Sequence, residues 1–560
     1  MRPGGRSWVV PMILDRVAGS SHPVAPVVQP DATATVRSHD GVRLATDVYL
    51  PPSSGTRRRS TTLVLRTPYG KRGAIDKVAE LASFLTTAGI ALVVQDVRGK
   101  FESDGATVPF IHEVADGYAT AQWISEQRWS NGAVVPFGDS YSGFTSWATA
   151  ASGHPAVRAA IVRVTTCHLP DEWMYRQGAF RLQQNAQWAA FAWSGRELVD
   201  VQPNWTRRPL DSVDLLGADR TQLMAWLGAA PESVRWRSEI LGHDPPLSRH
   251  VTVPVLHWGG WWDLMARGQV REWADLARNG SAAQLLVMSA TDHSFNPFSC
   301  VYGAAPPDSF ERQYSLVADF VAAAVDGSGP DAGSRVRWEL THDAWHEDVA
   351  WPPVDARPQR LYLADGPSAG FGPEGGALAS VPDSIATTVN VPYDPADLVP
   401  SLETFVWGTL ANAYPDERDV HIRPDVMTFS GASADEPIDI AGPVTLRLSA
   451  HVHGDGGQIT AALSDVHPDG RALRIAEGAV ELGVAEIGQV VEIDLGPLAY
   501  RMREGHRLRL AIAASAFPRY LWHSTDRLAA WGSAGGTPCE ISLRLDRECF
   551  LAAHYIRRQL

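Results

Sequence analysis

Short apolar runs alternate with helical patterns in the first third of the chain, and this alternation limits the fold more than any other feature. The runs, which have the length and apolar character of buried strands, lie at residues 61–66, 91–96 and 133–137. Helical patterns occur at residues 81–87, at residues 115–126 and from residue 140 to about residue 152. Strands that alternate with helices favour a parallel sheet with crossover helices, so we expect an α/β fold.

The alternation stops near residue 168 and resumes near residue 249. Between these points the sequence has a helical character, few β-branched runs and many aromatic residues. The α/β pattern then returns with strands at 253–256 and 284–289 and helices at 264–278 and about 310–325. We therefore predict an α/β core over residues 31–167 and 249–328, with a helical cap inserted over residues 168–248.

Helical periodicity almost vanishes after a Gly-rich and Asp-rich linker at residues 326–334. Short strand-like runs follow, separated by Gly, Pro and Asp turns. Many short strands with regular turns indicate a β-sandwich, so we predict a C-terminal domain of the jelly-roll type over residues 334–560. Residues 1–30 have no clear period and are predicted to form a loose leader.

Length and charge narrow the class of protein. The 560 residues are too many for one hydrophobic core, which agrees with several domains. The net charge of −14 argues against a nucleic-acid partner, because phosphate binding depends on Lys and Arg. No segment has the ~18 consecutive apolar residues of a membrane span. The apolar run at residues 8–14 is short for a secretory signal, so we expect a cytoplasmic protein with no membrane partner.

The four cysteines, Cys167, Cys300, Cys539 and Cys549, show neither metal-ligand spacing nor a disulfide framework. Reduced thiols are the simplest interpretation, and we expect no metal site. If one bridge forms, Cys539 and Cys549 are the nearest pair along the chain.

A serine lies where an apolar strand is predicted to turn into a helix, in the segment Gly138-Asp139-Ser140-Tyr141-Ser142-Gly143. The first five residues fit the pattern G-x-S-x-G with Ser142 as the last small residue. Small flanking residues let the backbone pass through a tight turn, which exposes the serine hydroxyl at the carboxyl end of the sheet. Ser140 is therefore the candidate nucleophile of an α/β-hydrolase core.

A serine hydroxyl needs a general base, and the base needs an orienting carboxylate. In this fold the carboxylate and the histidine follow the nucleophile in that order, each after a strand. Asp263 follows the strand at 253–256, and His293 follows the strand at 284–289. His257 and His243 compete for the role of base, but only His293 satisfies both the chain order and the strand-end position.

Acyl transfer also needs hydrogen-bond donors for the oxyanion. The backbone N–H of Tyr141, directly after the nucleophile, is the first candidate. The second donor usually comes from the loop after an early strand, here Arg66-Thr67-Pro68-Tyr69-Gly70-Lys71. This loop lacks a glycine-rich backbone hole, and the Tyr69 hydroxyl can do the same work.

Several motifs in the same order make the chain resemble the cocaine esterase and X-prolyl dipeptidyl peptidase family of acyl hydrolases. The resemblance extends from about residue 31 to the C-terminus. It rests on the segments 66–71, 95–99, 103–105, 138–143, 260–263, 292–294, 423–426, 465–470, 505–510 and 517–519.

The resemblance implies the same three domains and the triad Ser140, Asp263 and His293, with Tyr69 and Tyr141 as oxyanion donors. It also implies an acyl pocket near Trp173 and Met265. Relatives that hydrolyse α-amino acid esters carry carboxylates next to the triad aspartate. Here Leu264 and Met265 follow it, which favours an apolar acyl group over a substrate ammonium.

We therefore expect a cofactor-independent esterase or amidase that acts on a small-molecule substrate through an acyl-enzyme. An acyltransferase with the same triad is the alternative, because water and an acceptor compete for one acyl-enzyme. A non-catalytic binding protein is the third hypothesis, and the presence of Ser140, Asp263 and His293 argues against it. A homodimer is a candidate oligomeric state.

Overall fold

The computed structural model describes most of the chain. The described residues are 28–52, 59–73, 75–199, 203–205, 207–210, 221–229, 233–236, 241, 246–280, 284–295, 310–326, 334–402, 405–406, 409–410, 414–454, 456–483, 488–523, 527–532 and 536–556. His243, Cys300 and most of the predicted leader lie outside these residues.

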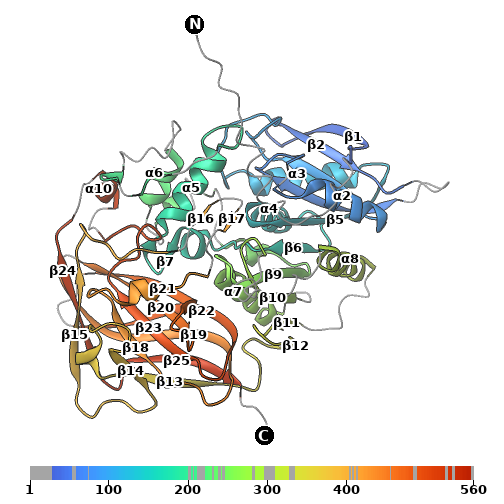
Figure 1. The fold of residues 1–560 in the computed structure, drawn as a ribbon. Coiled ribbons are helices and arrows are strands. Elements are labelled where there is room, and N and C mark those ends of the chain that lie inside the picture. The colour runs from blue at the N-terminus through green and yellow to red at the C-terminus, as the bar shows by residue number, and fades with distance from the viewer. Residues whose placement is uncertain are drawn as a thin grey trace.

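A ten-stranded sheet is formed by strands that lie between residues 32 and 348 (Figure 1). Its strands run parallel from β4 to β11, and antiparallel strands complete both edges. In spatial order they are β1 (Ala32–Arg37), β2 (Arg43–Tyr49), β4 (Ala91–Asp96), β3 (Ser60–Thr67), β5 (Ser130–Asp139), β6 (Ala160–Arg163), β9 (Val255–Trp262), β10 (Gln284–Asp292), β11 (Arg335–Glu339) and β12 (Trp345–Asp348). The predicted α/β fold is confirmed.

Helices cover both faces of this sheet because successive strand residues point to opposite sides. Along β3, Leu63 and Leu65 pack with the helices α2 (Val78–Thr87) and α8 (Phe310–Asp326). Val64, between them, belongs to the core on the other face, with α3 (Glu113–Ser125) and α4 (Ser140–Ala151). The helix α7 (Ala266–Arg278) follows β9 and packs on β10. The continuous apolar runs in the sequence thus reflect strands that are buried on both faces.

The segment between β6 and β9, called the cap below, is rich in buried aromatic residues. Its elements are η1 (Leu169–Met174), β7 (Tyr175–Arg176), β8 (Ala179–Phe180), α5 (Leu182–Trp193), α6 (Thr221–Leu227) and η4 (Leu247–His250). The β7–β8 hairpin was not predicted from the sequence. Every residue of α5 except Phe191 is buried, so this helix is enclosed rather than amphipathic.

The C-terminal part of the chain is rich in strands, as predicted. An eleven-stranded sheet contains β15 (Thr387–Tyr393), β24 (Cys539–Leu545), β19 (Ile438–His453), β25 (Phe550–Ile556), β13 (Ala356–Ala364), β14 (Gly376–Ala379), β18 (Met427–Ser430), β23 (Arg507–Ala513), β20 (Gly457–Val466) and β21 (Ala472–Leu482), with β22 (Gln489–Met502) paired to β19. Its short elements are η6 (Gly366–Ser368), β16 (Phe405–Val406), β17 (Thr409–Leu410), α9 (Arg418–His421) and α10 (Arg527–Gly532). The β-rich domain lies beside β9 and under the cap (Figure 1). The jelly-roll type remains a prediction.

Two details differ from the sequence analysis. The strands β11 and β12 fall inside the predicted C-terminal domain 334–560, yet they extend the ten-stranded sheet. The reason is that Val336 and Trp338 of β11 are buried in the core formed by β10 and α7. Cys539 and Cys549 are free thiols, so the candidate bridge between them is absent from the described part of the chain.

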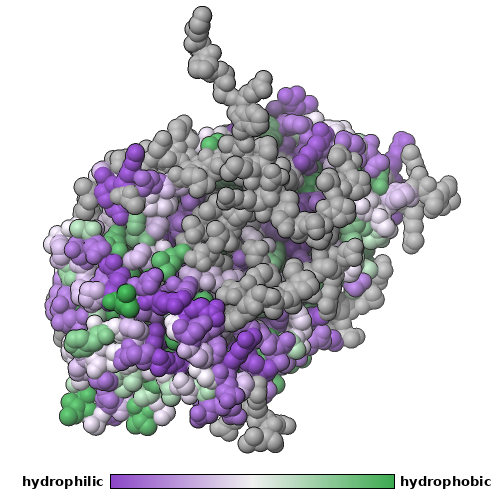
Figure 2. Space-filling view, viewed as in Figure 1, coloured by the Kyte–Doolittle hydropathy of each residue, from purple (hydrophilic) through white to green (hydrophobic). Residues whose placement is uncertain are grey.

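The surface in Figure 2 mixes polar residues with small apolar patches over the visible face of the β-rich domain. No helix among the described residues combines the length and the hydrophobicity needed to cross a membrane.

Candidate active site

The turn between β5 and α4 holds Ser140 in the left-handed region, with φ of 56°. This turn brings two backbone segments so close that a side chain would not fit between them. A Cβ on Gly138 would lie 2.3 Å from the carbonyl carbon and oxygen of Ser142. A Cβ on Gly143 would lie 2.7 Å from Thr165 Cγ2. The structure therefore requires glycine at both positions, whereas the sequence motif had emphasised Gly138 and Ser142.

Thr165 fixes the turn from the neighbouring strand. It follows β6, and its buried hydroxyl donates a 2.6 Å hydrogen bond to the Ser140 carbonyl oxygen. Thr165 was not predicted as a site residue from the sequence. Its only signal was its place directly beyond an apolar strand, a position that many structural threonines share.

Asp263 and His293 lie together because their strands are neighbours. β9 and β10 are parallel and pair Trp262 with Asp292, so the residue after each strand emerges at the same edge of the sheet. His293 Nδ1 lies 2.6 Å from Asp263 Oδ1, and His293 Nε2 lies 3.1 Å from Ser140 Oγ. The three predicted residues thus form one hydrogen-bonded line at the carboxyl ends of the strands.

The carboxylate of this line is buried and held in place. Asp263 is 7% exposed, and its Oδ1 also accepts a 3.1 Å hydrogen bond from the Met265 N–H. A carboxylate in this position fixes the tautomer and orientation of the histidine ring and stabilises the imidazolium.

The competing His257 has a different place. It lies within β9, fully buried, with its ring 5.5 Å from the ring of Trp147. Burial lowers the pKa of His257 to about 3, so it stays neutral at physiological pH. His257 packs in the core, and the described structure pairs Ser140 with His293.

The Tyr69 hydroxyl lies beside the Ser140 side chain. Trp188 Nε1 donates to it over 3.4 Å. Burial raises the pKa of Tyr69 well above its usual value, while hydrogen bonds with Trp188 and Ser140 oppose this rise. The phenol therefore stays protonated and keeps a proton to donate.

The Tyr141 hydroxyl forms hydrogen bonds with Glu113 and Phe110. It donates to Glu113 Oε1 over 2.8 Å and accepts a 2.8 Å hydrogen bond from the Phe110 N–H. The backbone N–H of Tyr141 lies in the first turn of α4, where helical N–H groups have no partner within the helix. The Tyr69 hydroxyl and the Tyr141 amide have the chemistry expected of oxyanion donors.

Aromatic rings from the cap surround this centre. The Trp173 ring centroid lies 5.2 Å from that of Trp188 and 6.5 Å from that of Tyr141. Met265, 2% exposed, begins the turn into α7 directly beyond Asp263 and Leu264. Trp188 was not predicted individually, because the cap sequence contains many aromatic residues with no motif to separate them.

A buried carboxyl ties α7 to the segment that supports Ser140. Glu272 Oε1 accepts hydrogen bonds from the Thr166 hydroxyl at 2.7 Å and the Cys167 N–H at 2.6 Å. Burial raises the pKa of Glu272 to about 8, because the charged form loses its hydration. Glu272 was not predicted as a site residue from the sequence.

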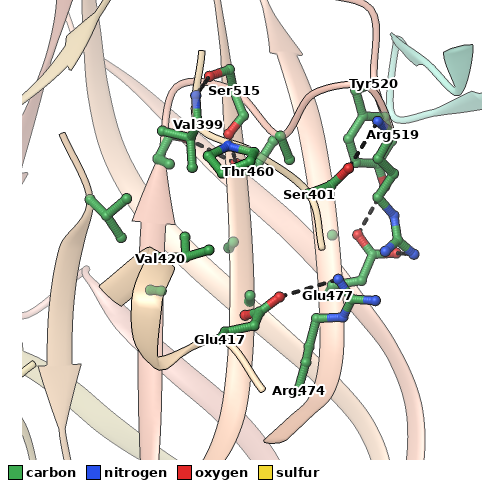
Figure 3. A pocket seen from close by; sticks show the side chains of 18 residues that line it. Val399, Ser401, Glu417, Val420, Thr460, Arg474, Glu477, Ser515, Arg519 and Tyr520 are labelled. Atoms are coloured by element: carbon green, nitrogen blue, oxygen red, sulfur yellow. Dashed lines mark hydrogen bonds and ion pairs between the residues drawn. The ribbon is translucent and has the colours of Figure 1, made fainter. Parts of the chain in front are cut away.

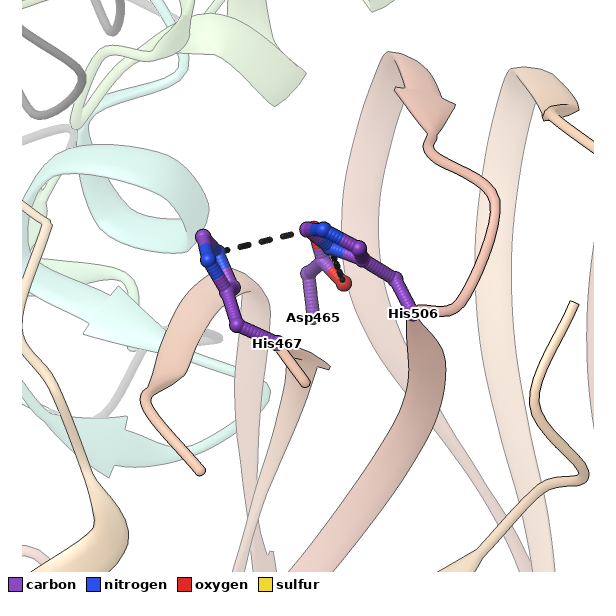
Figure 4. A group of neighbouring side chains, drawn as sticks. All are labelled: Asp465, His467 and His506. Atoms are coloured by element: carbon purple, nitrogen blue, oxygen red, sulfur yellow. Dashed lines mark hydrogen bonds and ion pairs between the residues drawn. The ribbon is translucent and has the colours of Figure 1, made fainter. Parts of the chain in front are cut away.

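One group of described residues has donor atoms close enough to hold a metal ion. Donor atoms of Asp465, His467 and His506 lie within 4.8 Å of one another, and all three side chains are buried (Figure 4). Several of these donor atoms already form hydrogen bonds within the protein. His506 Nδ1 lies 2.9 Å and 3.0 Å from the two Asp465 oxygens, and the Tyr500 hydroxyl donates to Asp465. We interpret the group as a polar network inside the β-rich domain.

Comparison with known proteins gives consistent results for both halves of the chain. Residues 40–295 match the model of X-Pro dipeptidyl-peptidase (S15 family), and residues 329–528 match the X-Pro dipeptidyl-peptidase C-terminal non-catalytic domain. Cocaine esterase of Rhodococcus sp. (strain MB1 Bresler) is 28% identical over 533 residues, which cover 87% of this chain and 90% of that protein.

Two solved structures share the overall fold. An aminopeptidase from the archaeon Thaumarchaeota archaeon aligns with a TM-score of 0.77 and 19% identity, covering 97% of this chain and 99% of its own. An alpha-amino acid ester hydrolase aligns with a TM-score of 0.73 and 21% identity, covering 96% and 99%.

Replacing Gly138 by alanine should destabilise the protein. The new Cβ would collide with the Ser142 backbone, which cannot move away as a flexible side chain could. Overpacking of this kind costs about 1–3 kcal/mol, so we expect a lower Tm in circular dichroism melts. Gly195→Ala is the control, because a Cβ there would meet nothing within 4 Å. Equal Tm values for the two variants would contradict this account of the turn.

The Glu272→Gln variant should gain stability relative to the wild type as the pH rises. The folded carboxyl, with its pKa of about 8, holds a proton that the unfolded chain releases near pH ~4.5. Between these values the folded state binds more protons, so wild-type stability falls with rising pH. Glutamine cannot ionise, so the Tm difference between variant and wild type should grow from pH 5 to pH 8. A constant difference would show that Glu272 titrates normally.

Proposed function

Because the chain belongs to the family of acyl hydrolases that includes cocaine esterase and X-Pro dipeptidyl-peptidase, we propose that it is a serine hydrolase acting on an ester or amide. In this proposal Ser140 is the nucleophile, His293 the general base and Asp263 the residue that orients it. The observation that carries the proposal is the hydrogen-bonded line from Asp263 through His293 to Ser140 at the strand ends.

The reaction proceeds through an acyl-enzyme. Ser140 Oγ attacks the substrate carbonyl carbon while His293 Nε2 takes the hydroxyl proton. The Tyr69 hydroxyl and the Tyr141 amide donate hydrogen bonds to the oxyanion. The bond to the alcohol or amine then breaks, and His293 returns the proton to the leaving group. A water molecule repeats the sequence on the acyl-enzyme, which releases the acid and restores Ser140.

The side chains around this centre favour a substrate with an apolar acyl group. The Trp173 ring lies beside the Tyr141 ring, Trp188 donates its ring N–H to the Tyr69 hydroxyl, and Leu264 and Met265 follow the triad aspartate. A cationic group against these side chains would lose its hydration without gaining an ion pair. We therefore assign Trp173 and Met265 to the wall of the acyl pocket.

Ser140→Ala should abolish hydrolysis of p-nitrophenyl acetate and butyrate. We expect kcat to fall by at least about 10³-fold, because the nucleophile is lost. A fluorophosphonate probe, read by mass, should label Ser140 in the wild type only. Ser146→Ala is the matched control on the same helix, since it loses only a 2.9 Å hydrogen bond to the Ser142 carbonyl.

The alternatives predict different results in the same assay. Labelled Ser140 with negligible release of p-nitrophenol would favour the acyltransferase. A folded wild type that takes no label would refute the triad and support a non-catalytic protein.

Tyr69→Phe removes one oxyanion donor while keeping the ring. Loss of such a donor costs about 10²–10³-fold in kcat, so we expect a fall of that size with little change in KM. Ser140 should still be present and accessible, which a slower but complete fluorophosphonate reaction would demonstrate. An unchanged kcat would exclude the Tyr69 hydroxyl from the oxyanion site.

A further inference from the structure

A buried arginine ends β6, between the strand that leads to Ser140 and the strands that lead to Asp263 and His293. Arg163 is 2% exposed, and its guanidinium lies over four aromatic rings. The distances to the ring centroids are 4.6 Å for Phe295, 5.3 Å for Trp258, 5.4 Å for Tyr314 and 5.7 Å for Phe137. Because aromatic faces attract cations, these rings hold the guanidinium in one place.

The ion-pair partner of Arg163 is the residue directly before Ser140. Arg163 Nε lies 3.0 Å from Asp139 Oδ1, and the pairing of β5 with β6 places these two residues opposite each other. Burial raises the pKa of Asp139, while attraction to Arg163, Lys77 and His293 opposes this rise. The Asp139 carboxylate is therefore close enough to His293 to act on its charge.

On its other side Arg163 contacts the turn that carries His293. The Phe295 N–H donates to the Asp292 carbonyl oxygen over 3.0 Å, which closes a tight turn around His293. Phe295 has a φ of 60°, and this conformation persists only where the surrounding structure enforces it. Its ring is the nearest of the four to the guanidinium. Arg163 thus contacts the residue before Ser140 and the second residue after His293.

The order of the strands makes such a bridge useful. Ser140 follows β5 and His293 follows β10, and β6 and β9 lie between these strands in the sheet (Figure 1). Three strand spacings amount to about 14 Å. The histidine turn must therefore reach back across the ends of two strands to place His293 Nε2 3.1 Å from Ser140 Oγ. Arg163 ends one of those two strands.

We propose that Arg163 is a positioning residue, which holds the turn at Ser140 and the turn at His293 in one fixed relation. The ion pair with Asp139 fixes the first turn, and the contact with the Phe295 ring fixes the second. Asp139 also neutralises a cation that would otherwise oppose the imidazolium formed on His293 during attack. This inference rests on the proposed hydrolase function and adds a residue on which its geometry depends.

Arg163→Met should lower kcat for p-nitrophenyl butyrate by about 10- to 100-fold with little change in KM, because a displaced general base impairs attack more than binding. Arg163→Lys should recover part of this loss, since it keeps the charge but not the planar guanidinium. Arg474→Met is the matched control and should keep kcat. It removes a buried arginine that pairs with Glu417 over 3.2 Å, on the wall of a small pocket in the β-rich domain (Figure 3). A folded Arg163→Met with wild-type kcat would overturn the proposal.

Phe295 tests the histidine side of the bridge without removing a charge. Phe295→Leu should lower kcat in the same way, and Phe295→Tyr, which keeps a ring face, should restore it. Phe320→Leu is the control, because Phe320 is buried in the same core but is not one of the four rings around Arg163. If Arg163→Met does not fold, equal kcat values for the two Phe295 variants would still overturn the proposal.

Asp139→Asn gives a signal that a purely structural role would not produce. The groups that act on this carboxylate are Arg163, Lys77 and His293, which favour its charge, and Asp263, Asp76 and the Tyr314 phenol, which do not. Without the Asp139 charge, protonation of His293 becomes less favourable. The acid limb of the kcat/KM profile should therefore move to lower pH by about 0.5–1 unit. Asp319→Asn, at an exposed position of α8, should leave the limb in place. An unmoved limb in Asp139→Asn would contradict the placement of the ion pair beside His293 and overturn the proposal.

Fluorophosphonate labelling separates this inference from the hydrolase proposal. A wild type that is labelled at Ser140 and hydrolyses the ester, with unchanged kcat in the folded Arg163 and Phe295 variants, would overturn the role of Arg163 alone. A folded wild type without labelling would refute both.

Discussion

The close approach of the end of β5 to the first turn of α4 is the constraint on which the site depends. The Gly138 backbone lies against Ser142, and Gly143 lies against Thr165, so any side chain there would push the segments apart. Thr165 then holds the Ser140 carbonyl from the next strand. These contacts keep a serine at positive φ with its hydroxyl at the edge of the sheet. Such a conformation persists only where the surrounding structure enforces it.

The order of strands in the sheet brings the other two residues of the line, Asp263 and His293, together. Asp263 and His293 lie 30 residues apart in the sequence, but each follows one of two adjacent parallel strands. The geometry of the line from Asp263 through His293 to Ser140 therefore comes from the backbone pairing of β9 with β10. The cap and the loop after Asp263 place aromatic rings and apolar side chains near this line.

Local signals explain which parts of this molecule could be predicted from the sequence. A few neighbouring residues are enough to indicate each of three features: the turn at Ser140, the strand ends before Asp263 and His293, and the alternation of strands and helices. Thr165 and Glu272 gave no such signal, because their roles depend on partners in other elements. The ion pair between Arg267 and Asp494 joins residues 227 positions apart in the sequence. The strand β11 was assigned to the wrong domain because pairing partners are not encoded locally.

Arg267 has a consequence for how the two halves of the chain behave as modules. It lies on α7, four residues beyond Asp263, and donates to the backbone carbonyls of Glu477 and Asp494 in the β-rich domain. Separating the halves would leave a buried guanidinium beside the catalytic loop without acceptors. The β-rich domain is therefore not a detachable accessory. It acts as part of the scaffold of the active-site loop, and a recombinant chimera that exchanges it must reproduce these two carbonyls to keep that loop in place.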